Sequence, residues 1–266
     1  MSDSVLYELD GGLAVITINR PDAMNALDVA TKVALRDTVT EAAENSAVRA
    51  VLLTGAGDRA FCVGQDLKEH VGLLKRQEET GEGALRTVAE HYNPLLRALA
   101  GMRKPTVAAV GGVAAGAGAS LAFACDFRIV ADTAGFNTSF AGVALTADSG
   151  ASWTLPRLVG HARATELLML PRTVKAEEAL RLGLATQVVP SAELADTARE
   201  FARRLAQGPT VAYGAIKESL AYGASHSLDE LLDKEDELQT LAGVSEDHRI
   251  AVNAFLAKEK PVFLGR

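Results

Sequence analysis

Residues 109–126 read AVGGVAAGAGASLAFACD, and this run of small residues decides the fold. It overlaps the apolar segment TVAAV at residues 106–110, which predicts a buried strand. Residues 106–125 carry no charge and are long enough to span a membrane. Gly111 and Gly112 break the run, however, so a buried strand, a turn and a buried helix are the better interpretation.

The helix that we expect to begin near Ala117 gives this stretch a chemical use. Small residues let the backbone approach a ligand closely. The first N–H groups of a helix have no intrahelical acceptor and carry a partial positive charge, which suits a developing oxyanion. The same composition also permits tight helix–sheet packing, and these residues alone support both interpretations equally.

On either side of this stretch, short apolar runs alternate with helical stretches. We expect strands at residues 12–19, 48–54 and 127–132. Asp28 is a suitable N-cap for a helix through about Glu44. Strands that alternate with helices predict an α/β fold in which helices cover the sheets.

The last third of the chain predicts consecutive helices with broad apolar faces. Ser191 has the character of an N-cap, and the residues that then share one helical face are Leu194, Ala198, Phe201 and Leu205. Residues 227–230 form a capping box before a leucine-rich helix that Gly243 ends. The leucines on one side of that helix are Leu228, Leu231, Leu232, Leu238 and Leu241. We therefore expect a core at residues 1–195, and at residues 196–266 a helical region that packs on the body or on another subunit.

Bulk composition limits the classes of partner. The 266 residues have a net charge of −7, which argues against a broad nucleic-acid surface but allows a small anionic ligand on a local basic patch. Cys62 and Cys125, the only cysteines, form no CxxC pair and predict free thiols in a reducing compartment. The start, MSDSVLYELD, has no apolar signal region, so we expect a cytoplasmic protein without a membrane segment.

Motifs for common cofactors are weak. Residues 51–60, VLLTGAGDRA, contain G-x-G-x-x-A after a strand, but the following FCVGQDL does not open a helix, and a glycine turn is favoured. The histidines, which show no metal-ligand spacing with one another or with cysteine, are His70, His91, His161, His226 and His248. We therefore interpret them as surface or structural residues and expect no metal site.

Asp148, within TADSGASW, is the carboxylate that stands out. Aspartate before Ser-Gly-Ala-Ser is a good helix N-cap, and capping is the commoner use of aspartate at such a position. A catalytic base would instead point into partly apolar surroundings that raise its pKa. From these residues alone, the capping role is favoured.

Four ordered motifs together resemble the crotonase superfamily, the group of enoyl-CoA hydratases and isomerases. INRPDAMNALD at residues 18–28 resembles the N-terminal strand-to-helix motif of that family. AFCVGQDL at residues 60–67 and the small-residue stretch at 107–130 resemble its two oxyanion loops. AFLAKEKPVF at residues 254–263 resembles its closing segment. The likeness runs from about residue 5 to the C-terminus.

The resemblance implies a spiral of β-β-α units and a backbone oxyanion hole for a coenzyme A thioester. The main-chain N–H groups of Gln65 and Ala117 would be the two donors, so the side chains at these positions would be free to vary. Coenzyme A would arrive as part of the substrate, and no further cofactor is implied.

The resemblance also implies where coenzyme A binds and how the chain assembles. Asp66 and Leu67, directly after the first donor, would line the coenzyme A site. Phe255 and Lys258 would help to bind the coenzyme A of a neighbouring subunit. The helical tail would hold the chains in a trimer or a dimer of trimers.

Departures from the family pattern bear on the reaction. Hydratases of this kind use two glutamates, and this chain has Ser120 and Phe140 at those positions. Asp148 matches the aspartate of the ring-1,2-epoxyphenylacetyl-CoA isomerase branch, and 4-chlorobenzoyl-CoA dehalogenases have their nucleophilic aspartate at the same position. The resemblance thus favours Asp148 as the base of a double-bond or ring-epoxide isomerase, even if it also caps a helix. An enoyl-CoA hydratase is the first alternative, and a non-catalytic acyl-CoA or RNA binder is the second.

Overall fold

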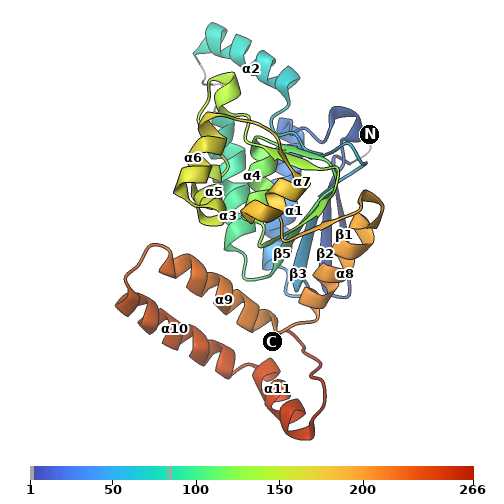
Figure 1. Ribbon diagram of the computed structural model, residues 1–266, viewed down its shortest axis with the longest axis vertical. Coiled ribbons are helices and arrows are strands. Elements are labelled where there is room, and N and C mark those ends of the chain that lie inside the picture. Colours follow the sequence, from blue (N-terminus) through green and yellow to red (C-terminus); the bar gives the residue numbers. More distant parts are fainter. Residues whose placement is uncertain (1–2, 82, 84–85) are drawn as a thin grey trace.

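The computed structural model describes residues 3–81, 83 and 86–266, which fold into two β-sheets surrounded by helices (Figure 1). The larger sheet, in spatial order, consists of β1 (Val5–Asp10), β2 (Leu13–Ile18), β3 (Ala50–Gly55), β5 (Thr106–Val110), β7 (Phe127–Ala131) and β10 (Gln187–Val189). The smaller sheet consists of β4 (Ala60–Cys62), β6 (Val113–Ala115), β8 (Gly135–Asn137) and β9 (Val174–Lys175). The three predicted strands and the strand TVAAV are confirmed.

The chain passes from the larger sheet to the smaller one at three corners. β3 is followed by β4, and the same step leads from β5 to β6 and from β7 to β8. Neighbouring strands are parallel except in the β1–β2 and β8–β9 pairs. The step from the larger to the smaller sheet occurs three times, with helices between the successive strand pairs. This produces the spiral of β-β-α units that the resemblance implies, so the predicted fold class is confirmed.

Glycine occupies two of these corners because no side chain fits there. A Cβ on Gly112 would lie 2.4 Å from the carbonyl oxygen of Arg59, and one on Gly55 would lie 2.2 Å from that of Phe61. The stretch at residues 51–60 therefore contains a turn, at residues 56–59 between β3 and β4, as predicted, and β4 rather than a dinucleotide-binding helix follows it.

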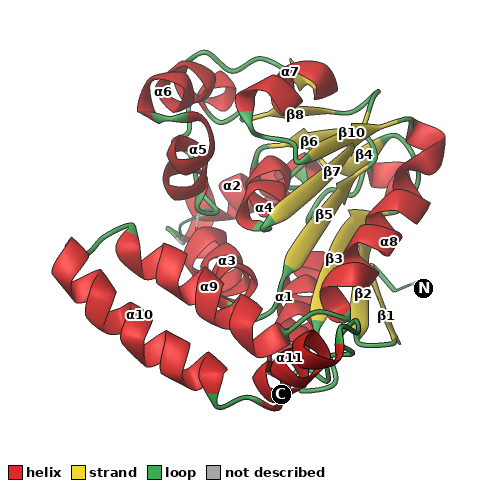
Figure 2. Cartoon of the chain, turned by 60° about the horizontal axis from the view of Figure 1, so that its bottom comes forward, coloured by secondary structure: helices red, strands yellow, loops and turns green. Residues whose placement is uncertain are grey.

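Helices lie on both faces of the larger sheet (Figure 2). Those of the body are α1 (Val29–Glu44), α2 (Leu67–Thr80), the π-helical η2 (Val88–Tyr92), α3 (Asn93–Gly101), α4 (Ala117–Ala124), α5 (Ala151–Val159), α6 (His161–Met169), α7 (Ala176–Leu182) and α8 (Leu194–Ala206). The short 3-10 turns are η1 (Pro21–Ala23), η3 (Ala141–Val143) and η4 (Ser191–Glu193). The side chain of Asp28 accepts the N–H of Thr31, which confirms Asp28 as the N-cap of α1.

α4 is the buried helix that the small-residue stretch predicts. All of its residues are buried, and it begins at Ala117 after Gly116, whose φ is 52°. The short strand β6, which the sequence did not indicate, lies between the predicted turn at Gly111 and Gly112 and this helix. Among the helices that the structure describes, none is long and apolar enough to cross a membrane.

α8 belongs to the body of the protein, because it packs across β3, β5 and β7. Its Leu194 and Ala198 are part of the hydrophobic core, and Phe201 and Leu205 are partly buried against that core, which confirms the apolar face expected for this helix. The predicted division after residue 195 falls inside α8. The helices that leave the sheets begin one element later, at α9.

Ser191 does not cap α8, and that prediction is wrong. The residue before α8 is Glu193, which makes no side-chain capping bond. Ser191 lies in η4, and its hydroxyl donates to Asp132 Oδ1 at 2.9 Å. Its side chain therefore hydrogen-bonds to the residue that follows β7 instead of capping a helix.

The three C-terminal helices extend away from the body (Figures 1 and 2). They are α9 (Thr210–Gly223), α10 (Leu228–Gly243) and α11 (Glu246–Ala257), and α9 pairs with α10. The capping box of Ser227 and Glu230 is present, and α10 ends at Gly243, so both predictions are confirmed. Leu228, Leu232 and Leu241 are exposed in the single chain.

Replacement of Gly118 tests the packing of α4. A Cβ at this position would lie 2.0 Å from the carbonyl oxygen of Cys62, so Gly118→Ala forces the backbone of β4 or α4 to move. We expect a loss of about 2 kcal/mol or more in the free energy of unfolding. Gly72→Ala in α2 is the matched control, because no atom lies within 4 Å of the added Cβ. Denaturant unfolding that gives both variants wild-type stability would contradict this packing.

Candidate functional site

The two predicted oxyanion loops meet at one edge of the smaller sheet. β4 and β6 pair in parallel with Cys62 opposite Ala114, so the segments that follow them leave the sheet side by side. Gly64 has a φ of 83°, and a Cβ there would lie 3.1 Å from the main-chain nitrogen of Ala117. The two loops therefore touch through their backbones at Gly64.

The two predicted donors have free main-chain N–H groups. In the described part of the chain, no acceptor pairs with the N–H of Gln65 or with that of Ala117. The peptides around Gln65 are fixed, because Leu27 donates to the oxygen of Gly64 at 2.8 Å and accepts from Asp66 at 3.1 Å. Ala117 is the first residue of α4, where the N–H points out of the helix. Such a pair of donors can accept the oxygen of a polarised carbonyl.

Asp148 lies beside the start of α4 and does not cap a helix. Its main-chain oxygen accepts from the Ser120 hydroxyl at 3.4 Å. The residue that precedes α5 is Gly150, which has no side-chain cap, so the capping interpretation of Asp148 is wrong. Ser149 and Gly150 both have positive φ angles, 50° and 74°, and they turn the chain between the carboxylate and the helix.

The surroundings of the Asp148 carboxylate favour its neutral form. Burial raises the pKa of this carboxyl, while a hydrogen bond from the Ser149 hydroxyl at 2.9 Å and the positive charge of Lys32 act in the opposite direction. A carboxylate that is partly desolvated in this way is a stronger proton acceptor than one in water. Asp148 therefore has the character that a general base needs.

The side chains at the two glutamate positions of hydratases carry no charge. Ser120 is buried within α4, and its hydroxyl donates to the oxygen of Gly116 at 3.2 Å. Phe140 is buried at the start of η3. Neither side chain can act as a carboxylate acid or base.

The side chain of Gln65 is held by two hydrogen bonds, and whether it can vary without loss of the chemistry stays a prediction. Its Oε1 accepts from the ammonium of Lys32 at 3.0 Å and from the hydroxyl of Tyr92 at 2.9 Å. Both donors are buried, so an alanine at position 65 would leave them without this acceptor. An unpaired buried donor typically costs about 1–3 kcal/mol.

Lys32 is a buried charged residue beside the first loop that sequence reasoning missed, and the signal for its burial was present. It is spaced three residues before Leu35, seven before Val39 and ten before Ala42, and all of these are buried. This is the spacing of one helical face, so a lysine there has to lie on the buried side of α1. Among the histidines, His91 Nδ1 lies 3.1 Å from the Thr87 hydroxyl that Lys32 contacts, which is compatible with the structural role expected for it.

Asp66 and Leu67 have different surroundings. Asp66 caps α2 by accepting the N–H groups of Lys68 and Glu69, and it pairs with Arg20 at 3.0 Å. Its carboxylate is therefore already occupied by structural contacts. Leu67 is 67 % exposed next to the first loop. Contact of either residue with coenzyme A stays a prediction.

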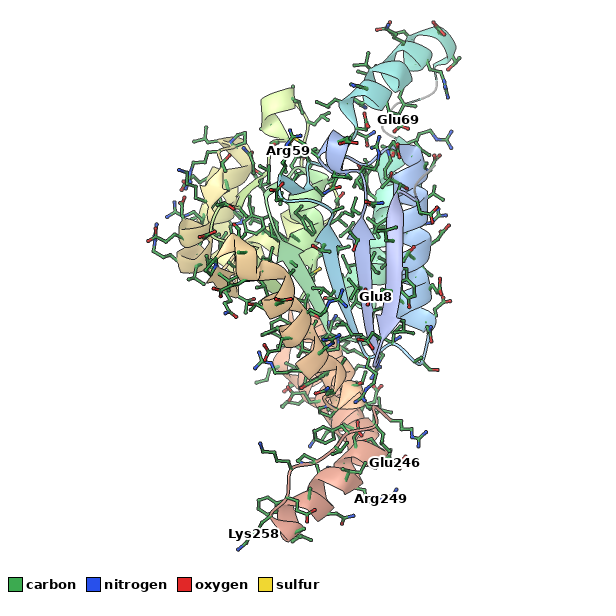
Figure 3. All side chains as sticks on the ribbon, turned by 90° about the vertical axis from the view of Figure 1, so that its right-hand side faces the viewer. Glu8, Arg59, Glu69, Glu246, Arg249 and Lys258 are labelled. Atoms are coloured by element: carbon green, nitrogen blue, oxygen red, sulfur yellow. The ribbon has the colours of Figure 1, made fainter. Side chains whose placement is uncertain are left out.

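Phe255 and Lys258 lie far from the two loops of their own chain. Figure 3 shows Lys258 at the end of the molecule opposite Glu69, which belongs to the first turn of α2. Phe255 is 82 % exposed, and Lys258 caps the C-terminus of α11 with a φ of 58°. These two residues do not join the site of the same chain, and their role in a neighbouring one stays a prediction.

The two cysteines are free and buried. Burial raises the pKa of the Cys62 thiol to about 12, although its sulfur accepts the N–H of Gly64 at 3.4 Å. Within residues 3–81, 83 and 86–266, no group of three or more His, Cys, Asp or Glu side chains is arranged to hold a metal ion.

Comparison with known proteins agrees with this geometry. The family model for enoyl-CoA hydratase/isomerase matches residues 8–266. The chain belongs to the enoyl-CoA hydratase/isomerase family. Its similarity to individual members extends over the full length.

Relatives of this family member carry two kinds of name. It is 40% identical to the 1,2-epoxyphenylacetyl-CoA isomerase of Escherichia coli, over 100% of both chains. It is 36% identical to the short-chain-enoyl-CoA hydratase of Clostridium acetobutylicum, over 97% of this chain and 96% of that one. The solved structure of an enoyl-CoA hydratase from Bacillus anthracis superposes with a TM-score of 0.91 at 31% identity, covering 99% and 100% of the two chains.

The main-chain donors of this enoyl-CoA hydratase/isomerase family member can be tested by two substitutions. Ala117→Pro removes one donor at the first position of a helix, where proline is otherwise tolerated. We expect turnover to fall by about 10²–10³-fold. Gln65→Ala keeps its N–H, so turnover should fall less, while the free energy of unfolding falls by about 1–3 kcal/mol.

Steady-state rates and thermal melts of both folded variants make this comparison. Equal loss of turnover in Gln65→Ala and Ala117→Pro would mean that the Gln65 side chain matters as much as a donor. The assignment of the backbone oxyanion hole would then be wrong.

Proposed function

We propose that this protein is an acyl-CoA isomerase that moves a double bond, or rearranges a ring epoxide, through an enolate intermediate. The observation that carries the proposal is the distribution of carboxylates around the two loops. Asp148 lies at the start of α4 with a pKa raised by burial, whereas Ser120 and Phe140 occupy the positions of the hydratase glutamates. One base without a second acidic group fits a proton shift better than the addition of water.

In the proposed mechanism, the thioester oxygen accepts the N–H groups of Gln65 and Ala117. Negative charge moves onto this oxygen as a proton leaves the acyl chain, so the two donors bind the enolate more strongly than the ground state. One such donor typically contributes about 3 kcal/mol. The partial positive charge at the start of the buried helix α4 adds to this stabilisation.

Asp148 is the proposed base that removes the proton and returns it to another carbon. Atoms and charge balance within the substrate, because the same proton leaves one carbon and is delivered to a second. A carboxylate of raised pKa holds the proton long enough to return it. A placed base of this kind contributes about 10²–10⁴-fold to the rate.

Space for the acyl group is available at the far end of α4. A hollow of about 340 Å³ lies between α3 and α5. It is lined by Asn93, Leu96, Arg97, Ala100, Ala124, Gly150, Trp153 and Thr154. Ala117 and Ala124 are the two ends of α4, about 10 Å apart at the rise of an α-helix. An acyl group that runs along this helix from the oxyanion hole would reach the hollow.

An enoyl-CoA hydratase is the second candidate, and the relative from Clostridium acetobutylicum favours it. In that case Asp148 would activate a water molecule instead of removing a proton from carbon. The same oxyanion hole would serve, because both reactions place negative charge on the thioester oxygen.

Assembly into a trimer, or a dimer of trimers, is part of the proposal. The exposed apolar side chains on α9, α10, α11 and the link between α10 and α11 support it, and the most exposed of these are Leu220, Leu228, Val244, Phe255 and Leu256. A patch of this kind on a single chain marks an interaction surface. Phe255 and Lys258 would then contribute to the coenzyme A site of the neighbouring chain.

Light scattering coupled to size exclusion measures this assembly. We expect a mass of three or six chains at micromolar concentration. Phe255→Ala should raise the KM for the acyl-CoA with little change in kcat. A monomer at that concentration would end the idea of a shared site.

The reaction is tested by assaying 3-enoyl-CoA isomerisation and crotonyl-CoA hydration side by side. We expect isomerisation to be faster. Asp148→Asn should lower turnover by about 10²-fold or more. Because burial raises the pKa of Asp148, its ionised form opposes folding at neutral pH, so the melting temperature should stay the same or rise.

Faster hydration than isomerisation in the wild type would replace the proposal by the hydratase. Full turnover in a folded Asp148→Asn variant would remove Asp148 from both mechanisms.

A further inference from the structure

Lys32 carries a charge that the proposed mechanism does not use. Its side chain is fully buried, although it belongs to the apolar face of α1. Transfer of an ammonium group from water into a protein interior costs several kcal/mol. A leucine or methionine would fill the same space without that cost, so stability alone does not account for a lysine at this position.

The ammonium of Lys32 makes two hydrogen bonds and one ion pair. It donates to Gln65 Oε1 at 3.0 Å and to Thr87 Oγ1 at 2.7 Å, and Glu69 Oε2 lies 3.7 Å away. The ring of Tyr92 lies below it, 5.3 Å from the nitrogen to the ring centroid. These partners come from the first oxyanion loop, from α2 and from the segment around η2. One buried charge thus joins three separate segments to α1.

These contacts fix the carboxamide of Gln65. Tyr92 donates to the same Oε1 at 2.9 Å, and Gln65 Nε2 donates to Glu69 Oε2 at 3.5 Å. With the neighbouring peptides already bonded to Leu27, both the main chain and the side chain of Gln65 are held. The direction of its free N–H is therefore set before substrate binds, as an oxyanion donor requires.

Lys32 also acts on the proposed base. Burial is the largest influence on the pKa of Asp148 and raises it, while the positive charge of Lys32 lowers it. Asp148 in turn raises the pKa of the Tyr92 hydroxyl, after the larger effect of burial. Lys32, Tyr92 and Asp148 therefore interact electrostatically across the site.

We propose that Lys32 is a positioning residue of the acyl-CoA site, which holds the Gln65 donor through its carboxamide and adds a positive charge to the electrostatic surroundings of Asp148. This inference rests on the proposed function, because it takes Gln65 as a donor and Asp148 as the base. The charged and titratable groups around Lys32 and Asp148 are Asp28, Asp66, Glu69, His91 and Tyr92.

The sign of the expected pH effect follows from these charges. Removal of the Lys32 charge takes away a group that favours ionised Asp148, so the pKa of this carboxyl rises further. A base works only when it is ionised. The acid limb of the pH–rate profile of kcat/KM should therefore move to higher pH.

Lys32→Met is the variant that tests the inference, and Lys104→Met is its matched control. Lys104 is a second buried lysine, and its ammonium donates to the carbonyl oxygens of Ala42 and Asn45 at the far end of α1. Burial lowers the pKa of both lysines. The two variants therefore remove the same kind of buried charge, but only one of them borders the site.

For Lys32→Met we expect kcat to fall about tenfold or more, because the donor is no longer held in place. The acid limb should move up by about one pH unit. Lys104→Met should lower the melting temperature and leave the acid limb where the wild type has it. A folded Lys32→Met variant with the wild-type kcat and acid limb would overturn the inference.

Two further variants keep the test decisive. Tyr92→Phe removes one bond to Gln65 without changing a charge, so kcat should fall while the acid limb stays. If Lys32→Met does not fold, wild-type kcat in Tyr92→Phe overturns the positioning role. An acid limb that disappears in His91→Asn would belong to His91 and overturn the electrostatic role.

Asp148→Asn separates failure of this inference from failure of the proposed function. If Asp148→Asn keeps its turnover, the base is wrongly assigned and the proposed function fails. If Asp148→Asn is inactive while Lys32→Met behaves as the wild type, only the inference about Lys32 fails.

Discussion

The architecture of the site depends on the contact between the backbone after β4 and the first turn of α4. Gly118 faces the carbonyl oxygen of Cys62 with no room for a Cβ, and a Cβ added to Gly64 would lie 3.1 Å from the Ala117 nitrogen. Because both contacts are made by main-chain atoms, they set the spacing of the two free N–H groups independently of the surrounding side chains. Side chains at positions such as 120, 140 and 148 can then differ between family members while the spacing of the two N–H groups stays the same.

Behind this contact, polar groups are buried in an otherwise apolar region, and each is bonded to another. Hydrogen bonds join the side chains of Lys32, Gln65, Thr87 and Tyr92. Glu69 lies at the edge of this group, at the N-terminus of α1, where its carboxylate accepts the N–H of Val29 at 2.9 Å. The π-helical turn at Val88–Tyr92 directs Tyr92 into this group, and such turns are frequent at functional sites. A fully bonded polar network of this kind defines one arrangement more sharply than apolar packing does.

The sequence predicted those parts of the fold in which local pattern and tertiary packing agree. The apolar runs became strands, and the small-residue stretch became a corner and a buried helix, because only small residues fit at these contacts. The two-residue break at Gly111 concealed β6, since a strand of three residues has too short a pattern to recognise. Asp148 was interpreted as a cap because its neighbours resemble a helix start, but the left-handed Ser149 moves the helix start two residues further on. Lys32 was missed because a charged residue is normally counted as exposed.

Cys62 has a chemical consequence for an enzyme of this family. Unsaturated thioesters are electrophiles that react with thiolates, and this sulfur lies two residues before the glycine at the oxyanion hole. Only the thiolate is reactive, and a pKa of about 12 leaves almost none of it at neutral pH. Cys125, at the other end of α4, is buried with a pKa raised to about 12 as well. The close packing around both ends of α4 thus also protects these two sulfurs from alkylation by unsaturated thioesters.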